Sequence, residues 1–257
     1  MYIYPDINDR LTVDLISRVS KGNYWDESEK LVLDMCYEKM NKAGLHLDLG
    51  SGQGRLIEPF LSHASMVVAA EPDITRFEYS KKEGERLNSI VNDKEVVTLN
   101  GDIDTVTENG FRTFDTALSS HVIQHIPLSM TGDMLRKLSE IINPGGYVFV
   151  TATYNNSDTD RFTVERLDDN EKREVEEVSE EEFEKAFHMK NILPVAFYTP
   201  SRIIDLMKNL GFFVETVFGY HFYFDDHDTT LEDDIKLNKA NDLSHARDVL
   251  YIFRKSI

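Results

Sequence analysis

An acid and three glycines form the most chemically informative pattern in the sequence. Asp48 lies in a short apolar run, and Gly50, Gly52 and Gly54 follow at every second position. Glycine is required where the backbone takes positive φ or approaches a ligand with no Cβ between them, and the N–H groups that open the next helix then face that ligand. The pattern predicts a strand over 45–49, a tight turn that holds a cofactor, and a helix after the turn.

The spacing of these glycines separates two classes of cofactor. A dinucleotide fingerprint has the pattern G-x-G-x-x-G, but Arg55 occupies its third glycine position. The carboxylate of Asp48 would also repel a phosphate, whereas it can accept hydrogen bonds from an ammonium group. The turn is therefore predicted to bind a cofactor with an amino acid moiety and not a pyrophosphate.

These residues resemble motif I of the class I S-adenosylmethionine (SAM) dependent methyltransferases, in which an acid and one further residue precede G-x-G-x-G. The resemblance implies that SAM is the cofactor and that it is bound by Asp48, Gly50, Ser51, Gly52 and Gly54. The alternative is a glycine turn that joins a strand to a helix without a ligand.

An acid at the end of the next predicted strand fits the same cofactor. The apolar run over 66–70 is predicted as a buried parallel strand that ends at Glu71, 21 residues after Gly50. That distance fits one β-α-β crossover and places the carboxylate where it can accept hydrogen bonds from both ribose hydroxyls. Pro72 stiffens the turn and is expected to touch the adenine, while Asp73 caps the following helix.

The segment after the third predicted strand, 96–99, resembles the adenine site of the same family. The resemblance implies that Asp102 accepts a hydrogen bond from the adenine amino group and that Ile103 covers the ring. A turn acid without a ligand is the alternative for Asp102.

The fourth predicted strand, 114–120, continues into 121–127, which resembles the post-strand segment of ubiquinone-type small-molecule methyltransferases. Ser120 is predicted to contact the cofactor, and His121 lies at the carboxyl end of the strand, where ligands of open α/β sheets bind. Because an isolated histidine titrates near neutral pH, His121 is the candidate to take a proton from an oxygen or nitrogen acceptor. The alternative is that His121 only shapes the pocket. His125 ranks behind it as a chemical group.

Two helices are predicted before the glycine motif, over 10–20 and from Asp26 to Gly44, the second opened by a capping box. The resemblance implies that such helices fold over the cofactor as a lid. Tyr24 and Trp25 then either line the acceptor pocket or pack the lid on the core.

The regular alternation of strands and helices breaks after a turn at 143–146 and a fifth strand at 147–151. The segment 155–198 is strongly acidic, yet its apolar residues predict a hairpin around 168–170 and a capping box at Ser179 predicts a helix. We interpret it as an inserted cap that selects the acceptor. The aromatic side chains that could wall an acceptor pocket there are Phe183, Phe187, Phe197 and Tyr198.

The sheet pattern then resumes. Thr199 caps a helix with proline at its first position, and Gly211 ends it. Strands at 212–214 and 248–253, with no helix between them, resemble the antiparallel end of the methyltransferase sheet. The segment 225–228 has residue types that can bind metals, but their spacing would not bring the side chains to one point on a helix or strand. We therefore expect an exposed loop and no metal site.

Together these elements predict an α/β fold. Its core is a doubly wound, Rossmann-like seven-stranded sheet with a terminal antiparallel strand, joined by an N-terminal helical lid and an inserted cap. The expected organisation is a lid at 1–43, a SAM-binding core at 44–154, the cap at 155–198 and the end of the core sheet at 199–257.

Composition bounds the partners. The 257 residues, 41% of them hydrophobic, can bury a sizeable core. No apolar run approaches the roughly 20 residues of a membrane span, and the first residues lack the order of a signal peptide, so we expect a cytoplasmic protein that does not enter a membrane. A net charge of −18 disfavours nucleic acid as a partner. The single cysteine, Cys36, excludes an internal disulfide.

The leading hypothesis is SAM-dependent methyl transfer to an oxygen, nitrogen or carbon atom of a small molecule. This displacement requires positioning, desolvation and at most one base, so a catalytic triad is not expected. An aminopropyl transferase of the same fold and a non-catalytic SAM-binding partner protein remain open. A nicotinamide oxidoreductase is disfavoured by Arg55, and residues 119–122 lack the Asn/Asp-Pro-Pro-Tyr pattern of amino-methylating nucleic-acid enzymes.

Overall fold

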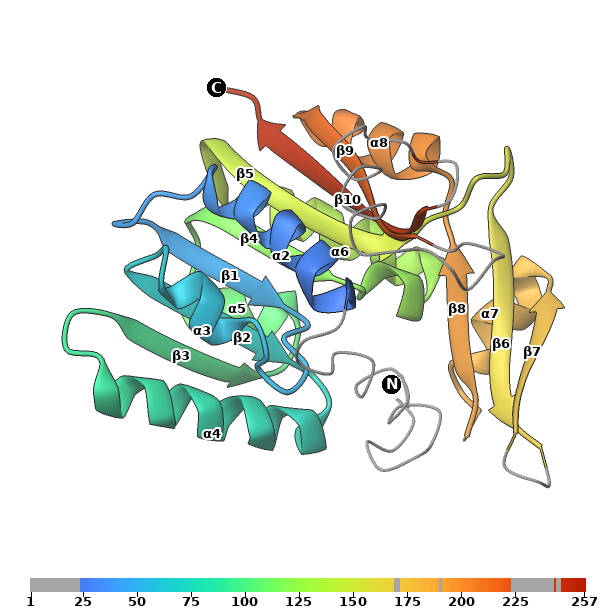
Figure 1. Cartoon of the computed structure of the whole chain (residues 1–257), viewed down its shortest axis with the longest axis horizontal. Coiled ribbons are helices and arrows are strands. Elements are labelled where there is room, and N and C mark those ends of the chain that lie inside the picture. The colour runs from blue at the N-terminus through green and yellow to red at the C-terminus, as the bar shows by residue number, and fades with distance from the viewer. Residues whose placement is uncertain (1–23, 169–171, 190, 223–242, 244–245) are drawn as a thin grey trace.

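The strands of the described residues form two separate sheets (Figure 1). The computed structural model describes residues 24–168, 172–189, 191–222, 243 and 246–257. The strands of the larger sheet are β1 (Leu45–Leu49), β2 (Met66–Glu71), β3 (Glu95–Asn100), β4 (Phe114–Ser120), β5 (Ile142–Thr153), β9 (Phe212–Phe222) and β10 (Ala246–Lys255). Their order is β3-β2-β1-β4-β5-β10-β9.

Strand direction confirms the predicted fold class. Strands β1 to β5 pair in parallel, while β10 runs antiparallel to both β5 and β9. The chain therefore winds outward from β1 in two directions, first through β2 and β3 and then through β4 and β5. The point between β1 and β4, where the order reverses, is where open α/β sheets bind ligands at the carboxyl ends of their strands.

Helices cover both faces of this sheet (Figure 1). The helices are α2 (Tyr24–Tyr37), α3 (Ile57–Leu61), α4 (Ile74–Ile90), α5 (Ile103–Glu108), α6 (Leu128–Ile141) and α8 (Pro200–Asn209), with a short 3-10 helix η1 (Ile123–His125). Apolar side chains of α2, α3 and α4 pack in one core cluster and those of α5, α6 and α8 in another. The parallel strands are thus buried on both faces, which explains their continuous apolar sequences.

The inserted cap has its own sheet. It consists of β6 (Arg161–Leu167), β7 (Arg173–Val178), α7 (Glu180–Ala186) and β8 (Leu193–Phe197), with the strand order β7-β6-β8. The predicted β6–β7 hairpin and the capping box of Ser179 and Glu182 are confirmed. Strand β8 was not predicted, and it makes β6 the central strand. Figure 1 shows the cap on the side toward which the parallel strands point.

Two of the cap aromatics pack in the hydrophobic core. Phe183 and Phe187 are 0% and 1% exposed, and Phe183 contacts both Phe162 and Phe187 with ring centroids 5.0 and 4.9 Å apart. They belong to the cluster that also covers one face of the large sheet. The expectation that Phe183 and Phe187 wall a pocket is therefore corrected, because the hairpin needs them to cover its own apolar face.

Several predicted element boundaries differ from the structure. Helix α2 begins at Tyr24 and not at Asp26. It ends at Tyr37, where the Lys39 and Met40 amides donate to carbonyls three residues earlier. Strand β5 includes the predicted turn 143–146, since Ile142 already pairs with Phe114 through an irregular register. Strand β9 extends beyond its predicted end, and strand β10 extends beyond the predicted range at both of its ends.

Some predictions fall on residues outside those described. These are the first lid helix over 10–20, the segment 225–228, and the side chains of Tyr24 and Trp25, whose backbone lies in α2. None of the described helices is both long and apolar enough to cross a membrane.

Candidate active site

The glycine turn after β1 has an open face. Gly50, Gly52 and Gly54 all have positive φ, at 79°, 56° and 85°. A Cβ at Gly50 would collide with Val122, and one at Gly54 would lie 3.0 Å from the Ser80 Cα, so those two glycines are required by packing. A Cβ at Gly52 would meet nothing within 4 Å. Gly52 therefore has open space where a side chain would stand, which leaves room for the predicted ligand.

Asp48 is a buried acid on the second-last position of β1. Its side chain is 2% exposed, and its Oδ2 atom has no hydrogen-bond partner among the described residues. Burial raises the pKa of Asp48 to about 7, the nearby Arg55 lowers it, and Glu71 raises it further. Because buried polar atoms in folded proteins are almost always hydrogen-bonded, this oxygen is suited to accept a hydrogen bond from a bound ligand.

Glu71 joins the end of β2 to the glycine turn. Its Oε2 accepts from the Gly52 amide at 2.8 Å and its Oε1 from the Asp73 amide at 2.9 Å. Burial raises the pKa of Glu71, and these two backbone hydrogen bonds oppose the rise. A carboxylate has about four acceptor positions, so two hydroxyl groups of a ligand can still bind here. Pro72 is exposed beside it.

Asp102 and Ile103 follow β3 but are mostly engaged within the protein. The Asp102 Oδ1 caps α5 by accepting from the Asp104 and Thr105 amides at 3.0 and 3.4 Å. Ile103 is 3% exposed and packs in the core below α5. Its contact area for an adenine ring is therefore small, and both residues remain predicted ligand contacts.

The segment after β4 meets the glycine turn, since Val122 packs against Gly50. The Ser120 hydroxyl lies 3.0 Å from that of Thr151. His121 has a φ of 55°, and its amide donates to the Thr151 carbonyl at 2.9 Å. Positive φ is uncommon for a residue other than glycine and concentrates at functional sites, which supports the choice of His121 as a site residue.

Two side chains that the sequence did not identify contact His121. The Tyr220 hydroxyl lies 3.1 Å from Nε2, and the Gln124 Oε1 lies 3.2 Å from Nδ1. Gln124 also contacts His125, whose pKa is lowered to about 4 by burial. Gln124 lies between the two histidines in sequence, which was a usable signal. Tyr220 is 99 residues from His121, and nothing local indicated it.

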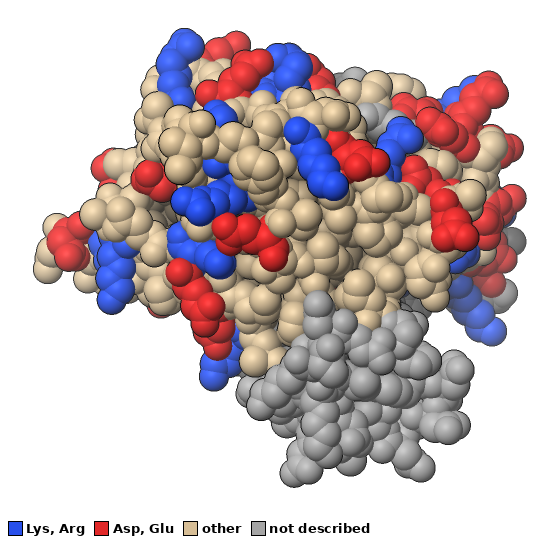
Figure 2. All heavy atoms as spheres, turned by 90° about the horizontal axis from the view of Figure 1, so that it is seen from above, with Lys and Arg blue, Asp and Glu red and all other residues tan. Residues whose placement is uncertain are grey.

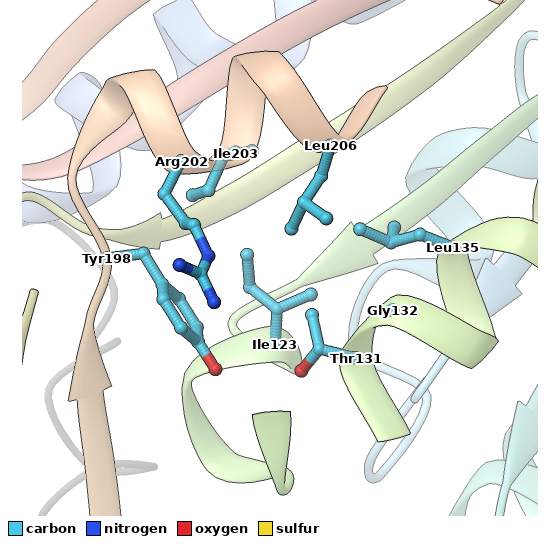
Figure 3. A pocket seen from close by; sticks show the side chains of 8 residues that line it. All are labelled: Ile123, Thr131, Gly132, Leu135, Tyr198, Arg202, Ile203 and Leu206. Atoms are coloured by element: carbon cyan, nitrogen blue, oxygen red, sulfur yellow. The ribbon is translucent and has the colours of Figure 1, made fainter. Parts of the chain in front are cut away.

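A small pocket lies on the sheet face that carries α6 and α8 (Figure 3). Figure 3 shows the Tyr198 hydroxyl pointing to the same end of the pocket as the Thr131 side chain, with the Arg202 guanidinium beside the apolar side chain of Ile123. The pocket begins two residues past His121, and one of its lining residues, Tyr198, is among the aromatic side chains predicted to wall an acceptor pocket. Among the described residues, no group of acids, histidines and cysteines is arranged to hold a metal ion.

The described residues thus fit a cofactor with a cationic amino acid group and a ribose. The Asp48 Oδ2, which no described residue hydrogen-bonds, suits an ammonium group. The carboxylate of Glu71 suits a diol, and the open backbone at Gly52 is held next to that carboxylate by its amide hydrogen bond. A diphosphate would place its negative charges beside Asp48 and Glu71, which opposes a dinucleotide.

Comparison with known proteins gives the class. A family model described as a methyltransferase domain matches residues 24–217. The chain belongs to this methyltransferase family, and it is an enzyme of that class and not a dinucleotide-dependent oxidoreductase. No curated protein matches the sequence significantly.

Solved structures share the fold over nearly the whole chain. A SAM-dependent methyltransferase from Mesorhizobium loti is 14% identical, with 89% of this chain and 98% of that chain covered and a TM-score of 0.54. One from Clostridium acetobutylicum is 13% identical, with coverages of 96% and 97% and a TM-score of 0.59. The 1,6-didemethyltoxoflavin-N1-methyltransferase of Burkholderia thailandensis is 12% identical, with coverages of 95% and 84% and a TM-score of 0.59.

Proposed function

We propose that this protein transfers a methyl group from SAM to a small-molecule acceptor in the cytoplasm. The observation that carries the proposal is the buried Oδ2 of Asp48, which has no hydrogen-bond partner among the described residues, together with the open backbone at Gly52 four residues later. Bound SAM would supply a methyl group on a positively charged sulfur. The protein's part is to hold that cofactor and the acceptor in line and to exclude water.

Each site residue has a distinct proposed role. Asp48 accepts hydrogen bonds from the ammonium group of SAM, and Glu71 accepts them from the ribose hydroxyls. The turn of Gly50, Ser51, Gly52 and Gly54 supplies close backbone contact. Further proposed cofactor contacts are Pro72, Asp102, Ile103 and Ser120. His121 is the proposed base that takes a proton from an oxygen or nitrogen acceptor.

A small acceptor fits the charge of the protein better than a nucleic acid does. With a net charge of −18, the protein repels a phosphate backbone. On the face in Figure 2, Lys and Arg side chains are interspersed with Asp and Glu. The Burkholderia neighbour is named for a small acceptor, and its structure holds 1,6-didemethyltoxoflavin with S-adenosylhomocysteine. The cap beside the carboxyl ends of the strands is the proposed acceptor-selecting unit.

Titration calorimetry with SAM tests the cofactor assignment without knowledge of the acceptor. We expect micromolar affinity for the wild type, about −8 kcal/mol. Asp48→Asn and Glu71→Gln each remove a charge-assisted hydrogen bond and should weaken binding by about 1.5 to 3 kcal/mol, or roughly 10- to 150-fold. Glu85→Gln, an exposed carboxylate on α4, is the matched control and should bind like the wild type.

Two results would contradict the assignment. One is equal SAM affinity in the wild type and both site variants. The other is saturable binding of NADH at micromolar protein, because Asp48 and Arg55 oppose a pyrophosphate.

A further inference from the structure

We propose that Gln124 is a positioning residue that fixes His121 as its Nδ1–H tautomer and so makes Nε2 the nitrogen that can take a proton. The inference rests on the proposed role of His121 as a base. It is carried by a continuous series of hydrogen bonds from Tyr220 through His121, Gln124 and His125 to β8 of the cap.

The orientation of the Gln124 amide is set by the backbone. The Thr153 amide donates to the Gln124 Oε1 at 2.7 Å. A backbone N–H can only donate, so the atom that faces Thr153 must be the oxygen and not the NH2 group. Strand β5 ends at Thr153, and the amide group of Gln124 is therefore held by a rigid element.

This orientation decides where His121 carries its proton. The same Oε1 atom lies 3.2 Å from the His121 Nδ1. Because a carbonyl oxygen only accepts, Nδ1 must be the protonated nitrogen. In the neutral ring Nε2 then has a lone pair, and the Tyr220 hydroxyl, 3.1 Å away, donates to it.

The hydrogen bonds at the His125 end of the series require the same orientation of the Gln124 amide. The NH2 group of Gln124 lies 3.2 Å from the His125 Nε2, which must accept. The proton of neutral His125 is then on Nδ1, which lies 3.0 Å from the Pro194 carbonyl and donates to it. Burial lowers the pKa of His125 to about 4, so this ring is neutral at pH 7. Two fixed backbone groups, the Thr153 amide and the Pro194 carbonyl, thus require the same assignment of donors and acceptors along the series.

The arrangement prepares His121 for proton uptake at a single atom. When Nε2 gains a proton, the bond from Nδ1–H to Gln124 remains and now comes from a cationic donor, which strengthens it. No ring flip or amide rotation is needed. Pro194 also connects the series to the cap, so the acceptor-selecting unit and the proposed base share one set of hydrogen bonds.

NMR of the full-length protein with 15N-labelled histidine tests the inference. Long-range 1H–15N correlation spectra distinguish protonated from unprotonated ring nitrogens, and the His121 signals are those lost in His121→Asn. At about pH 7.5, where an ordinary imidazole is neutral, we expect His121 of the wild type to be protonated at Nδ1. In Gln124→Met the acceptor is removed, and the proton should shift toward Nε2.

Two variants serve as controls. Gln124→Glu keeps an acceptor for Nδ1–H and should keep that nitrogen protonated. Tyr220→Phe keeps the aromatic ring but removes the hydroxyl, and the tautomer should stay unchanged because Gln124 sets it. Should Gln124→Met not fold, the wild type and Tyr220→Phe still decide the question.

The inference is overturned if His121 of the wild type carries its proton on Nε2, if folded Gln124→Met retains the wild-type tautomer, or if Tyr220→Phe loses it. SAM titration of the same samples separates the two proposals. Loss of the Nδ1–H tautomer with intact SAM binding would reject only the positioning role, and absence of SAM binding would reject only the proposed function.

Discussion

At the residue scale, the features that suit Asp48 to ligand binding also lower the stability of the ligand-free protein. A buried carboxylate without a described partner for one oxygen destabilises the folded state when it is charged. The same oxygen is suited to a cationic ligand group. Active sites commonly carry such unfavourable groups, because the surrounding fold stabilises what the site needs.

The burial of Asp48 predicts an unusual pH dependence of the stability of the ligand-free protein. The folded pKa of Asp48 is raised from 3.8 to about 7, so the folded state holds this proton where the unfolded chain has lost it. The Asp48 contribution to stability is complete below about pH 4 and is lost as the pH rises to about 7. Asp48→Asn should therefore be about as stable as the wild type at pH 4 and below, and more stable than the wild type by on the order of 2 to 4 kcal/mol at pH 8.

Urea unfolding at several pH values measures this difference. Glu85→Gln again serves as the control and should show no pH-dependent gain. A constant difference between Asp48→Asn and the wild type across the range would show that Asp48 has an ordinary pKa in the folded state.

At the scale of elements, different glycines of the turn serve packing and binding: Gly54 is required by packing, and Gly52 is proposed to contact the cofactor. Gly54→Ala would bring a Cβ to 2.9 Å from Ile57 and 3.0 Å from the Ser80 Cα, in addition to the strain of positive φ. Gly52→Ala adds only the strain, about 1 to 2 kcal/mol. We expect Gly54→Ala to lose clearly more stability in urea unfolding, while Gly52→Ala remains folded but binds SAM more weakly by calorimetry. If SAM affinity is unchanged in Gly52→Ala, the open face of the turn does not contact the cofactor.

The cap should behave as part of the core and not as a detachable flap. Phe183 is fully buried between Phe162 and Phe187, so Phe183→Ala should destabilise the protein by about 3 to 5 kcal/mol. Val175→Ala, at a position on β7 that is 59% exposed, should change stability by less than about 0.5 kcal/mol. Urea unfolding of the two variants measures this difference. If Phe183→Ala were as stable as the wild type, Phe183 would not be a core residue and the original prediction that it walls a pocket would stand.

At the scale of the whole molecule, the charge should influence the rate of cofactor binding. SAM carries a net positive charge, and a protein with a net charge of −18 attracts it over distances that salt shortens. Stopped-flow association should slow several-fold for SAM between about 0.01 and 0.15 M salt, as the Debye length falls from about 30 to about 8 Å. S-adenosylhomocysteine lacks the sulfonium charge and is the matched control. Equal salt dependence for the two ligands would exclude long-range steering by the protein.

The sequence by itself determined the features that depend on residue type and short spacing. Positive φ at Gly50, Gly52 and Gly54 follows from glycine recurring after an apolar run, and capping at Asp73 and Ser179 follows from side chains that bond amides three residues away. The fold class follows from the same local rules, because strand and helix periods are written in consecutive residues.

The tertiary structure decided what depends on contacts between distant segments. Strand β8 exists because β6 offers it an edge, so its five residues had no decisive local pattern. Within the described part of the chain, the Asp48 Oδ2 is left without a partner and Tyr220 meets His121 across 99 residues only when β1, β4 and β9 are placed in one sheet. The residue types that do chemistry are local information, whereas burial, pKa and hydrogen-bond direction are properties of the packed fold.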